Sequence, residues 1–340
     1  MGIIFLLLQS VMFWNLENFF DYRCDSLSVS DAEFSSLGDR HWTKKRFYTK
    51  CNAVAKAILW IGSEEGALPD VIGLAEIENA FVLRRLLSAT ALRKVGYKIV
   101  HYDSPDPRGI DVALLYRSST QQLVSSTPIH IDSVRTRDIL HVRLRDKGGT
   151  VGSSGDSPPD SGGALTDYFV CHLPSKYGGE KTSLSRRSIA VRRLLFAVDS
   201  ISVIPSVSSV IPSDSERISV IAGDTLGLRP RYDIPVVIMG DFNDTPESPA
   251  FGELSRRFFP LAAPLAAKGV GTIRFDGKWE LIDHFYVSPG LEAEMKAVLV
   301  PFLVTEDRTH GGLKPLRTYS GPRYTAGVSD HLPIVLMKKN

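Results

Sequence analysis

Polar side chains stand directly after apolar runs at several places in the chain. The most informative string is Ile238–Pro246, in which an apolar strand ends in Gly-Asp-Phe-Asn. This order places the carboxylate of Asp241 and the carboxamide of Asn243 where a strand meets a loop. An Asp-x-Asn sequence after a strand is also the usual composition of an Asx turn that reverses the chain. Taken alone, the string favours turn chemistry and catalytic chemistry equally.

The same arrangement recurs at the ends of other predicted strands. An Asp-His pair such as Asp330-His331 is either a hydrogen bond at a strand edge or a histidine held in a chosen charge state near neutral pH. Glu76 ends an apolar strand, and a lone buried carboxylate is costly unless it meets a cation. Strand ends without a function would carry random turn residues instead. The full set is Asn15, Glu76, His172, Asp241 with Asn243, Asp283, and Asp330 with His331.

The oxygen-rich character of this set indicates a hard divalent cation. Carboxylates and carboxamides, together with water, suit Mg²⁺ or Mn²⁺. The three cysteines, Cys24, Cys51 and Cys171, are too few and too scattered for a zinc site or a disulfide framework, and they favour a reducing compartment. We therefore expect Mg²⁺, or Mn²⁺ in its place, as the cofactor.

The elements that must position these residues alternate between short strands and longer helices. Apolar residues recur at helical spacing in 47–61 and 184–198, and each segment combines one apolar stripe with a basic face. Mixed strands with external helices form a layered α/β domain. The expected strands are Val71–Ala75, Tyr97–Tyr102, Val112–Tyr116, Leu140–Leu144, Tyr168–Cys171, Pro235–Met239, Phe285–Ser288, Leu332–Met337 and a first strand that runs from Ile3–Leu8 into Val11–Trp14.

Length and composition describe a chain with a full buried core. Of its 340 residues 43% are hydrophobic, and 40 Lys and Arg balance 38 Asp and Glu to a net charge of +2. This balance argues against a protein that binds nucleic acid mainly by blanket neutralisation of phosphates.

Residues 3–8 are too short to span a bilayer and lack the preceding positive charge and the cleavage site of a signal peptide. We expect a cytoplasmic protein without stable membrane insertion; a secreted or periplasmic one stays open if this segment is the remnant of a signal.

Two segments depart from the alternation of strands and helices. Residues 147–164 consist largely of Gly, Ser, Pro and Asp, which cannot bury enough apolar surface to become ordered, so we expect a mobile hairpin loop. Residues 202–231 are rich in Ser and Pro and are expected to be irregular. The motifs extend from residue 15 to residue 331, which favours a single catalytic domain over residues 1–340.

In their order along the chain, these motifs resemble the landmarks of the endonuclease/exonuclease/phosphatase superfamily. That group includes pancreatic-type deoxyribonucleases, abasic-site endonucleases, neutral sphingomyelinases and inositol-polyphosphate 5-phosphatases. The resemblance implies a four-layer α/β (α+β) sandwich, in which two packed mixed β-sheets have helices on the outside, and a metal-dependent hydrolase of phosphate esters. The strings 108–113 and 174–179 look like those of a bacterial branch without an assigned substrate. The matching strings are Trp14–Asn18, Leu74–Glu76, His172–Ser175, Gly240–Asn243, Ile282–His284 and Ser329–His331.

The resemblance also implies roles for the acidic and amide residues. Glu76 looks like the main metal ligand, with Asn15 beside it and Asp330 as a further ligand. Asp241 would position or deprotonate the attacking water, and Asn243 would hold the scissile phosphate.

For the histidines, the resemblance leaves one question open. His331, oriented by Asp283, would bind a phosphoryl oxygen or act as the base, so the base is either His331 or Asp241. His172 stands where relatives place a His or Tyr that contacts the phosphate or the leaving group. Ser175 departs from the Asn of some nucleases, which weakens the case for abasic-site activity.

Further residues are assigned to substrate binding, and each has a plain structural alternative. Arg108 and Asp111 flank a strand start, where they form a surface ion pair or where Asp111 is the partner of His172. Residues 317–324 mix bases with aromatics, which would clamp a phosphate and stack a ring, or would pack as a loop on itself. Arg186, Arg187, Arg192 and Arg193 are expected to form a solvated helix face. The substrate-binding set is Arg108, Asp111, Ser175, Lys176, Arg186, Arg317 and Tyr324.

The sequence thus predicts a divalent-metal-dependent hydrolase of phosphate esters, most simply a phosphodiesterase or nuclease that acts by in-line attack of water. In-line displacement spreads more negative charge over the phosphoryl oxygens, so a divalent ion and positioned donors stabilise the transition state more than the ground state. The alternatives are a phosphatase of a small phosphoester, such as an inositol phosphate or a phospholipid headgroup, and a catalytically silent binding module on the same fold. We expect a phosphate-ester substrate, with DNA and RNA among the choices, and a monomer.

Overall fold

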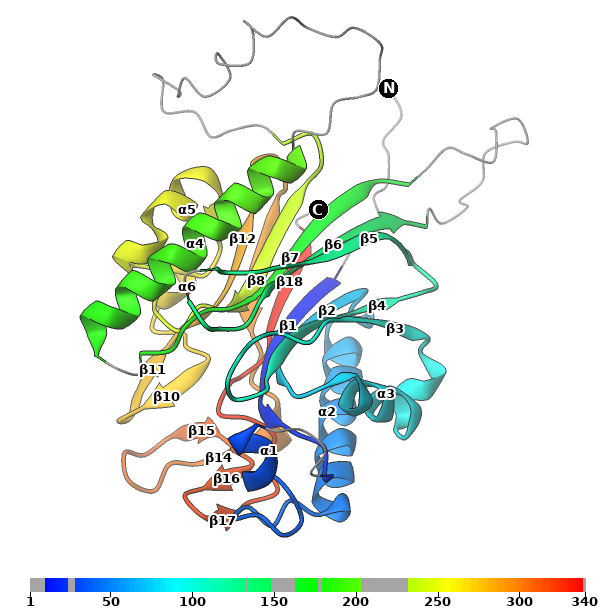
Figure 1. Ribbon diagram of the computed structural model, residues 1–340, viewed down its shortest axis with the longest axis vertical. Coiled ribbons are helices and arrows are strands. Elements are labelled where there is room, and N and C mark those ends of the chain that lie inside the picture. The colour runs from blue at the N-terminus through cyan, green and yellow to red at the C-terminus, as the bar shows by residue number, and fades with distance from the viewer. Residues whose placement is uncertain are drawn as a thin grey trace, which may run out of the picture.

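Two six-stranded β-sheets lie face to face with helices on their outer sides, which confirms the expected four-layer sandwich (Figure 1). The computed structural model describes residues 10–23, 28–132, 134–147, 163–176, 179–202 and 232–338. The first sheet has the order β13-β18-β1-β2-β4-β3, formed by β1 (Ser10–Phe19), β2 (Val71–Ile77), β3 (Tyr97–His101), β4 (Asp111–Arg117), β13 (Ala293–Ala297) and β18 (Ile334–Lys338). The second has the order β5-β6-β7-β8-β12-β9, formed by β5 (Gln121–Ile129), β6 (Ile139–Asp146), β7 (Leu165–His172), β8 (Val236–Asp241), β9 (Phe259–Pro260) and β12 (Asp283–Val287).

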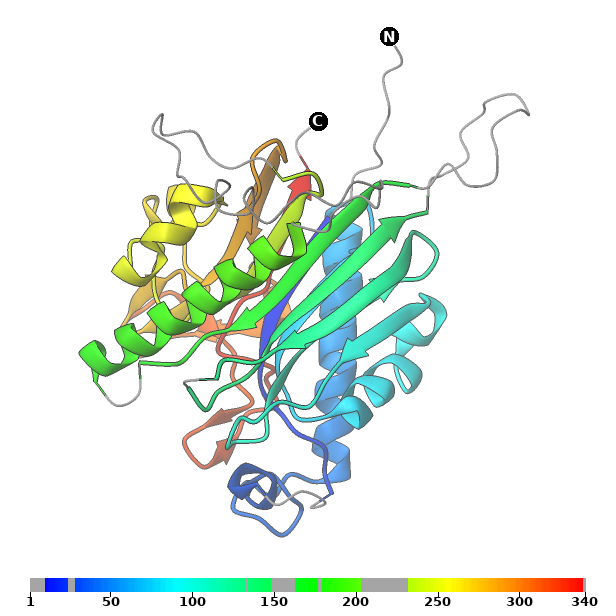
Figure 2. The same cartoon turned by 45° about the horizontal axis from the view of Figure 1, so that its top comes forward.

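Each sheet carries its own helical layer. Helices α2 (Lys44–Glu64) and α3 (Ala80–Ser88) cover the first sheet, and α4 (Glu180–Ser202) and α5 (Gly252–Arg257) cover the second (Figures 1 and 2). The smaller elements are α1 (Val29–Glu33), α6 (Ala263–Ala266), the 3₁₀ turns η1 (Ala91–Lys94), η3 (Pro249–Phe251) and η4 (Pro301–Leu303), and the hairpins β10–β11 (Ile273–Phe275, Lys278–Glu280), β14–β15 (Val304–Glu306, Leu313–Pro315) and β16–β17 (Tyr319–Ser320, Arg323–Tyr324). Across the described ranges, we find no helix with both the length and the apolar character that a bilayer crossing requires.

Successive residues of a strand face opposite sides of its sheet, and their apolar side chains form three apolar layers between the four layers of the sandwich. In β1, Val11 and Phe13 face the second sheet, whereas Met12 and Trp14 face the layer under α2. Gly73 of β2 lies against the second sheet, where a Cβ would stand 2.8 Å from the sulfur of Met239. The absence of a side chain at Gly73 therefore allows the two sheets to approach each other closely.

The predicted strands and both predicted helices are present. Strand β1 is longer than expected, because Asn15 and Glu17, expected to follow the strand, belong to it. Strand β5 was not predicted, since Leu123 and Val124 are exposed on this edge strand and blur its alternation. The apolar segment 3–8 lies outside the described residues.

Both low-complexity segments also fall largely outside the described residues, namely at 148–162 and 203–231. At the base of the first, β6 and β7 pair antiparallel, and the Asp146 N–H donates to the Ala164 carbonyl at 2.9 Å. The connection is therefore a hairpin, as expected. The mobility of 147–164 and the irregularity of 202–231 stay predictions.

The expected solvated arginine face of α4 is wrong for Arg187. Arg186 and Arg192 are exposed, but Arg187 is 1% exposed and its Nη2 donates to Asp244 Oδ2 at 2.7 Å. Its Nη1 also donates to the carbonyl of Pro174. Arg187 thus fastens α4 to the loops that follow β7 and β8, both of which carry site residues.

We predict that Arg187→Ala destabilises the fold far more than Arg186→Ala does. Truncation removes the hydrogen bonds from the buried guanidinium to Asp244 and to the Pro174 carbonyl, and a hydrogen bond that involves a charged group contributes roughly 1.5–3 kcal/mol, although Asp244 keeps Lys176 and Ser248 as partners. The exposed Arg186 is a matched control on the same helix, where truncation should change the free energy of unfolding by less than about 0.5 kcal/mol. Urea denaturation of both variants measures the difference, and equal losses would contradict the role given to Arg187.

Candidate active site

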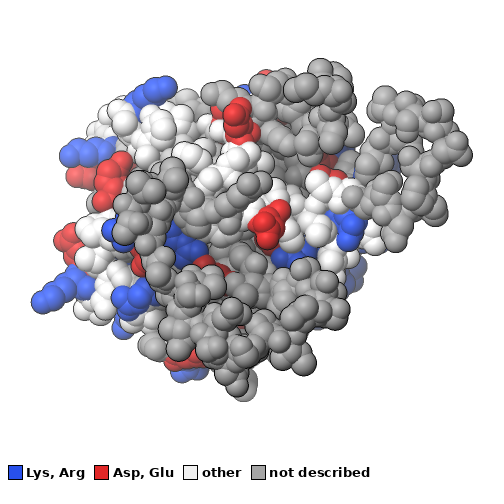
Figure 3. Space-filling view, turned by 90° about the horizontal axis from the view of Figure 1, so that it is seen from above, with Lys and Arg blue, Asp and Glu red and all other residues white. Residues whose placement is uncertain are grey.

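All eight strand-end residues meet at one end of the two sheets. Strands β1 and β2 run parallel, as do β7 and β8, so the carboxyl ends of each pair lie together. Strands β18 and β12 run antiparallel to β1 and β8, so their amino ends lie there as well. The hydrogen bonds from Asn15 to Asp241 and between His331 and Asp283 join the two sheets, so these ends lie together. The other end of the molecule is seen in Figure 3, where the described Lys and Arg are interspersed with Asp and Glu.

The carboxylate of Asp241 lies at the centre of this group. Asn15 Nδ2 donates to Asp241 Oδ2 at 3.0 Å, and the backbone N–H of Asn243 donates to Asp241 Oδ1 at 2.8 Å. The Nε2 atoms of His172 and His331 lie 3.5 and 3.8 Å from Asp241 Oδ2. Burial raises the pKa of Asp241 to about 7, although His331 and the hydrogen bonds from Asn243 and Asn15 oppose this rise. A carboxyl with such a pKa can exchange a proton near neutral pH.

The surroundings of His331 favour its charged form. Its Nδ1 is 2.8 Å from Asp283 Oδ2, its carbonyl accepts from Trp14 Nε1, and its N–H donates to Ser329 Oγ. Burial alone would lower the pKa of His331, but Asp283 and Asp241 outweigh it and raise the pKa well above its usual value. The ring therefore presents an Nε2–H donor next to Asp241.

His172 has the opposite charge preference. It is 4% exposed, and its Nε2 lies 3.8 Å from Glu76 Oε1. Burial lowers the pKa of His172 well below its usual value, and the guanidiniums of Arg137 and Arg108 lower it further. The two imidazoles nearest Asp241 Oδ2 therefore have pKa values that are shifted in opposite directions.

The backbone at the site is held in a conformation that side-chain-bearing residues seldom adopt. Glu17, Asn18, Glu76 and Asn243 have φ angles of 46°, 50°, 60° and 53°. The pairing of β1 with β2 is irregular between Asn15 and Phe19, which spans the first two of these residues. Each left-handed residue costs on the order of 1 kcal/mol or more and persists only where the surrounding structure enforces it. The strands are thus bent at the positions where their side chains enter the site.

One cluster at the site has donor atoms close enough together to hold a cation. Asp241, Asp283 and His331 each offer one atom within 4.8 Å of the others. However, His331 Nδ1 already bonds to Asp283, and a charged imidazole has no lone pair for a metal. This group is therefore better suited to proton transfer than to ligation.

Glu76 is a separate candidate ligand. One oxygen, Oε2, accepts the Asn18 N–H at 2.7 Å, while the side-chain groups paired with Oε1 among the described residues are the more distant His172 and Arg108, the latter at 4.0 Å. Asp330 keeps 35% of its side chain exposed. Carboxylate oxygens that are accessible and incompletely hydrogen-bonded fit a hard divalent cation.

The residues assigned to substrate binding divide between the site and its surroundings. Arg108 lies beside Glu76, and Arg317 pairs with Glu17 at 2.8 Å and with Asp330 at 3.2 Å. Lys176 pairs with Asp244 at 3.3 Å and Glu280 at 3.8 Å, Ser175 is exposed, and Arg186 is exposed on α4. Tyr324 packs on Trp42 and Tyr319, which favours the alternative of a loop that packs on itself.

The expected pairing of Asp111 with His172 is wrong. Asp111 Oδ2 lies 3.0 Å from His101 Nε2, and its Oδ1 accepts the N–H of Ser104 at 2.9 Å. The next residue, Val112, faces the layer between the sheets, so the side chain of Asp111 points to the opposite face, away from His172. The buried Asp111 is not part of a surface ion pair either.

Two buried cations beside the site were missed from the sequence. Lys50 of α2 donates to the Glu17 carbonyl at 2.6 Å and to Thr318 Oγ1 at 2.8 Å, and burial lowers its pKa to about 8. Its position within the apolar stripe of α2 is a sequence sign that it is buried. Arg137 donates to Asp106 Oδ2 and to the Leu173 carbonyl, the residue after His172. Arg137 precedes β6 in a loop, where no periodicity marks it.

Comparison with known proteins identifies one family. A family model described as "Endonuclease/Exonuclease/phosphatase family" matches residues 10–211 and 221–339. No curated protein matches the chain.

Solved structures resemble the chain over nearly its whole length. The catalytic domain of human nocturnin with a bound sulfate anion is 17% identical with a TM-score of 0.55, over 98% of this chain and 94% of that one. The mannosyl-6-phosphatase of Bacteroides thetaiotaomicron is 13% identical with a TM-score of 0.55, over 97% and 100%. TDP2 of D. rerio, complexed with a single-strand DNA product, is 14% identical with a TM-score of 0.51, over 98% and 99%. At such identities these likenesses show the fold alone.

We predict that Asp283→Asn lowers the pKa of the His331 imidazole. The substitution removes the nearest negative charge while the burial that disfavours the cation remains. A histidine-ring NMR titration of both forms measures the change. As a control, Asp167→Asn removes the carboxylate 2.8 Å from His141 and should leave the His331 titration as it is. An equal His331 pKa in the wild type and Asp283→Asn would contradict the pairing.

Proposed function

The chain belongs to the endonuclease/exonuclease/phosphatase family, and from this premise we propose that it is a divalent-metal-dependent phosphodiesterase. The family supports a phosphoesterase in general. The finer proposal rests on one observation: the buried Asp241, whose pKa is raised to about 7, is flanked by a neutral and a charged imidazole and stands beside the incompletely bonded Glu76. A group that exchanges protons, a charged hydrogen-bond donor and a candidate metal ligand thus lie within one connected set of side chains.

In this proposal Glu76, Asn15 and Asp330 hold the cation. When bound, a divalent cation neutralises charge on the phosphoryl oxygens and polarises the phosphorus toward attack. Asn15 already contacts Asp241, so its side chain links the cation ligands to the acid–base group. Asp330 is the most exposed of the three and is therefore the easiest for a hydrated ion to reach.

The protein's own residues orient the reaction. Asp241 accepts a hydrogen bond from the attacking water and takes its proton as the bond to phosphorus forms; the P–O ester bond opposite the water breaks, and the leaving oxygen takes a proton from solvent. His331 donates its Nε2–H to a phosphoryl oxygen, which gains negative charge in the transition state. Asn243 Nδ2 donates to the Leu173 carbonyl at 2.9 Å, and its second amide hydrogen serves the phosphate. His172, neutral and buried, contacts the phosphate or leaving-group side.

A phosphomonoesterase is the second candidate, because one of the structures with this fold is a mannosyl-6-phosphatase. Substrate specificity resides in loops rather than in shared strand ends, so activity must be tested across classes. A panel of bis-p-nitrophenyl phosphate, p-nitrophenyl phosphate, plasmid DNA, RNA and inositol phosphates, each with Mg²⁺, Mn²⁺ or chelator, separates the candidates. The proposal requires chelator-sensitive hydrolysis of at least one diester. Hydrolysis of monoesters alone would favour the phosphatase, and no hydrolysis would favour the silent binding module.

We predict that Glu76→Gln strongly lowers activity at sub-millimolar Mg²⁺ without unfolding the chain. The carboxamide keeps the shape but loses the charge that holds a hard cation. We expect kcat/KM on bis-p-nitrophenyl phosphate to fall about 100-fold or more, since even the loss of a group that orients a metal ligand costs roughly 10–100-fold.

Glu78→Gln is the matched control. Glu78 lies two residues away and accepts the backbone N–H of Asp21 at 2.7 Å, so the substitution should leave the Mg²⁺ dependence unchanged. Full activity of Glu76→Gln at low Mg²⁺ would remove Glu76 from the metal site.

We also predict that His331 and Asp283 act as one unit. His331→Ala should lower kcat strongly, because the lost donor acts mainly in the transition state, and Asp283→Asn should also slow the reaction. A double-mutant cycle on kcat/KM at saturating Mg²⁺ should show that the two losses are far less than additive. Strict additivity would mean that the residues work separately.

A further inference from the structure

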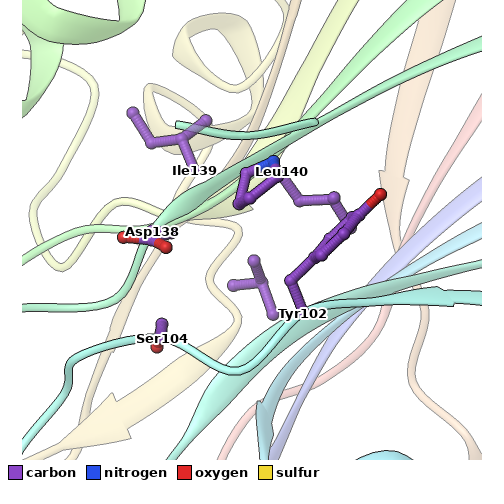
Figure 4. A pocket seen from close by; sticks show the side chains of 7 residues that line it. Tyr102, Ser104, Asp138, Ile139 and Leu140 are labelled. Atoms are coloured by element: carbon purple, nitrogen blue, oxygen red, sulfur yellow. The ribbon is translucent and has the colours of Figure 1, made fainter. Parts of the chain in front are cut away.

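The small pocket between the edges of the two sheets has no room for an organic group. Asp138 and Ser104 lie along one side of it and Tyr102 on the other (Figure 4). Its cavity volume is about 10 Å³, which is the space of about one water molecule. Contacts to a substrate larger than a phosphate group therefore fall to the surface of the molecule and not to this pocket.

The charges of the chain are unevenly distributed over that surface. Residues 40–63 and 79–102 contain 11 of the 40 Lys and Arg and none of the 38 Asp and Glu. The rest of the chain thus carries 29 Lys and Arg against 38 Asp and Glu. The two segments include α2, α3, η1 and β3, which lie together on the side of the first sheet (Figures 1 and 2). The net charge of +2 is therefore the sum of one positive region and an acidic remainder.

Most cations of this region are exposed and have no carboxylate partner. Eight of them lie at the surface, and none of the eight forms an ion pair with a described residue. By contrast, Arg108, Lys176 and Arg317 beside the candidate active site each face a carboxylate. Like charges that lack partners repel one another, so a bound anion would stabilise this side of the molecule. The eight residues of this basic layer are Lys44, Lys45, Lys56, Arg84, Arg85, Arg93, Lys94 and Lys98.

Two residues of the basic layer stand where they oppose a helix dipole. Lys44 and Lys45 are in the first turn of α2 together with Arg46, and this turn contains no acidic residue. Because a helix N-terminus carries partial positive charge, cations in the first turn destabilise the helix. Helix stability therefore does not account for these cations, whereas a bound polyanion would offset both the dipole and the mutual repulsion.

The basic layer begins at the end of the sheets where the candidate active site lies. Helix α3 starts four residues after Glu76, and Lys50 holds the first half of α2 at the Glu17 carbonyl, 2.6 Å away. From Lys44 to Lys56 the helix rises about 18 Å. This is the length of roughly five nucleotides of a stacked strand, at about 3.4 Å each. A chain of phosphates that leaves the site can thus follow the layer over several nucleotides.

Cations and rings connect the site to the layer. The ring centroids of Tyr22 and Phe81 are 6.3 Å apart, and the guanidiniums of Arg23 and Arg85 lie 3.9 and 5.0 Å from the Phe81 centroid. The Lys44 ammonium lies 5.9 Å from the Tyr22 centroid. Because cations already lie against these rings, the cluster offers positive charge and not free ring faces for stacking. It is therefore suited to phosphates more than to bases.

A nucleic acid fits the basic layer better than an anionic membrane does. Surfaces that bind in a membrane interface usually combine basic residues with exposed large apolar side chains. The large apolar side chains that are exposed among the described residues lie outside α2 and α3. A nucleic acid, in contrast, needs only cations along its backbone and presents a phosphodiester to the site at the end of the layer.

We propose that the basic layer binds the sugar–phosphate backbone of a nucleic acid, one of whose phosphodiesters enters the candidate active site. Contacts to the backbone carry no sequence information, so the layer binds without preference for a base. The choice of a nucleic acid rests on the phosphodiesterase function proposed above, but binding to the layer does not require hydrolysis.

The test measures the fluorescence anisotropy of a labelled 12-mer oligothymidylate in the presence of chelator. The wild type should bind it, with an affinity that falls as salt rises. The triple variant Lys44→Gln, Lys45→Gln, Arg84→Gln should bind at least about 10-fold more weakly at low salt. Its slope of log affinity against log salt should be smaller by about 2, since each neutralised phosphate of a single strand contributes about 0.7.

The matched control is the triple variant Lys181→Gln, Arg192→Gln, Arg256→Gln. It makes the same change in net charge, with exposed cations of α4 and α5 over the second sheet. It should bind the oligonucleotide as the wild type does. Equal weakening in both variants would show that binding follows net charge alone and would overturn the proposal, as would a wild type that does not bind the oligonucleotide.

Two further measurements separate the partners and the two proposals. Binding of the wild type to vesicles of phosphatidylcholine and phosphatidylserine, without binding to the oligonucleotide, would assign the layer to a membrane and overturn the proposal. With Mg²⁺, the basic-layer variant should lower the ratio of kcat/KM for the oligonucleotide to that for bis-p-nitrophenyl phosphate about 10-fold, because the small diester does not reach α2. An unchanged ratio would overturn the proposal. Binding as expected without hydrolysis of either diester would count against the proposed function alone.

Discussion

A buried hydrogen bond fixes the two sheets against each other at the end where the polar residues gather: Asn15 Nδ2 of β1 donates to Asp241 Oδ2 of β8 at 3.0 Å. Residues 226 positions apart in the chain thereby share one buried carboxylate. The bond requires the sheets to lie at close distance and in a fixed alignment, which Gly73 permits by leaving room for Met239. Once β1 and β8 are aligned in this way, their pairing with β2, β7, β12 and β18 brings the remaining strand ends to the same place.

Several features of the site are unfavourable for folding when each is taken alone. Asp241 is buried with a raised pKa, two of the strand-end histidines are buried in opposite charge states, and Glu76 and Asn243 have left-handed backbones. Each of these features destabilises the fold by itself. The apolar layers on both sides of each sheet offset them, and buried ion pairs such as Arg187–Asp244 hold the loops that carry the site. The geometry of the polar centre is therefore a property of the whole sandwich and not of any one motif.

Much of this arrangement could be predicted because a strand end is a local feature of the sequence. An apolar run followed by Asp-Phe-Asn or preceded by Asp-His marks both the strand and the edge at which its polar residue stands. What could not be predicted was which face a side chain takes. Asp111 sits next to Val112, and only the assignment of Val112 to the inter-sheet layer turns Asp111 toward His101 and away from His172.

Arg187, by contrast, lies three residues after Leu184 and four before Val191, so its place on the buried stripe of α4 could have been recognised from helical spacing. Lys50 offered the same sign on α2. Arg137 lies before β6 without any periodic pattern, and only the tertiary structure brings it to the carbonyl of Leu173, the residue after His172.

The charges around the site limit how a substrate can be recognised. Arg108, Lys176 and Arg317, which the sequence offered as phosphate-binding cations, already face carboxylates in the described structure. A phosphate that enters must compete with those carboxylates, which agrees with a net charge of only +2 for the chain. In the proposed metal site, a bound cation would share the charge of Glu76 and Asp330 and would weaken their hold on Arg108 and Arg317, so the proposal implies that phosphate binding and cation binding favour each other. Affinity for the phosphate then depends on the cation, and discrimination among phosphate esters is left to groups that contact the organic part of the substrate.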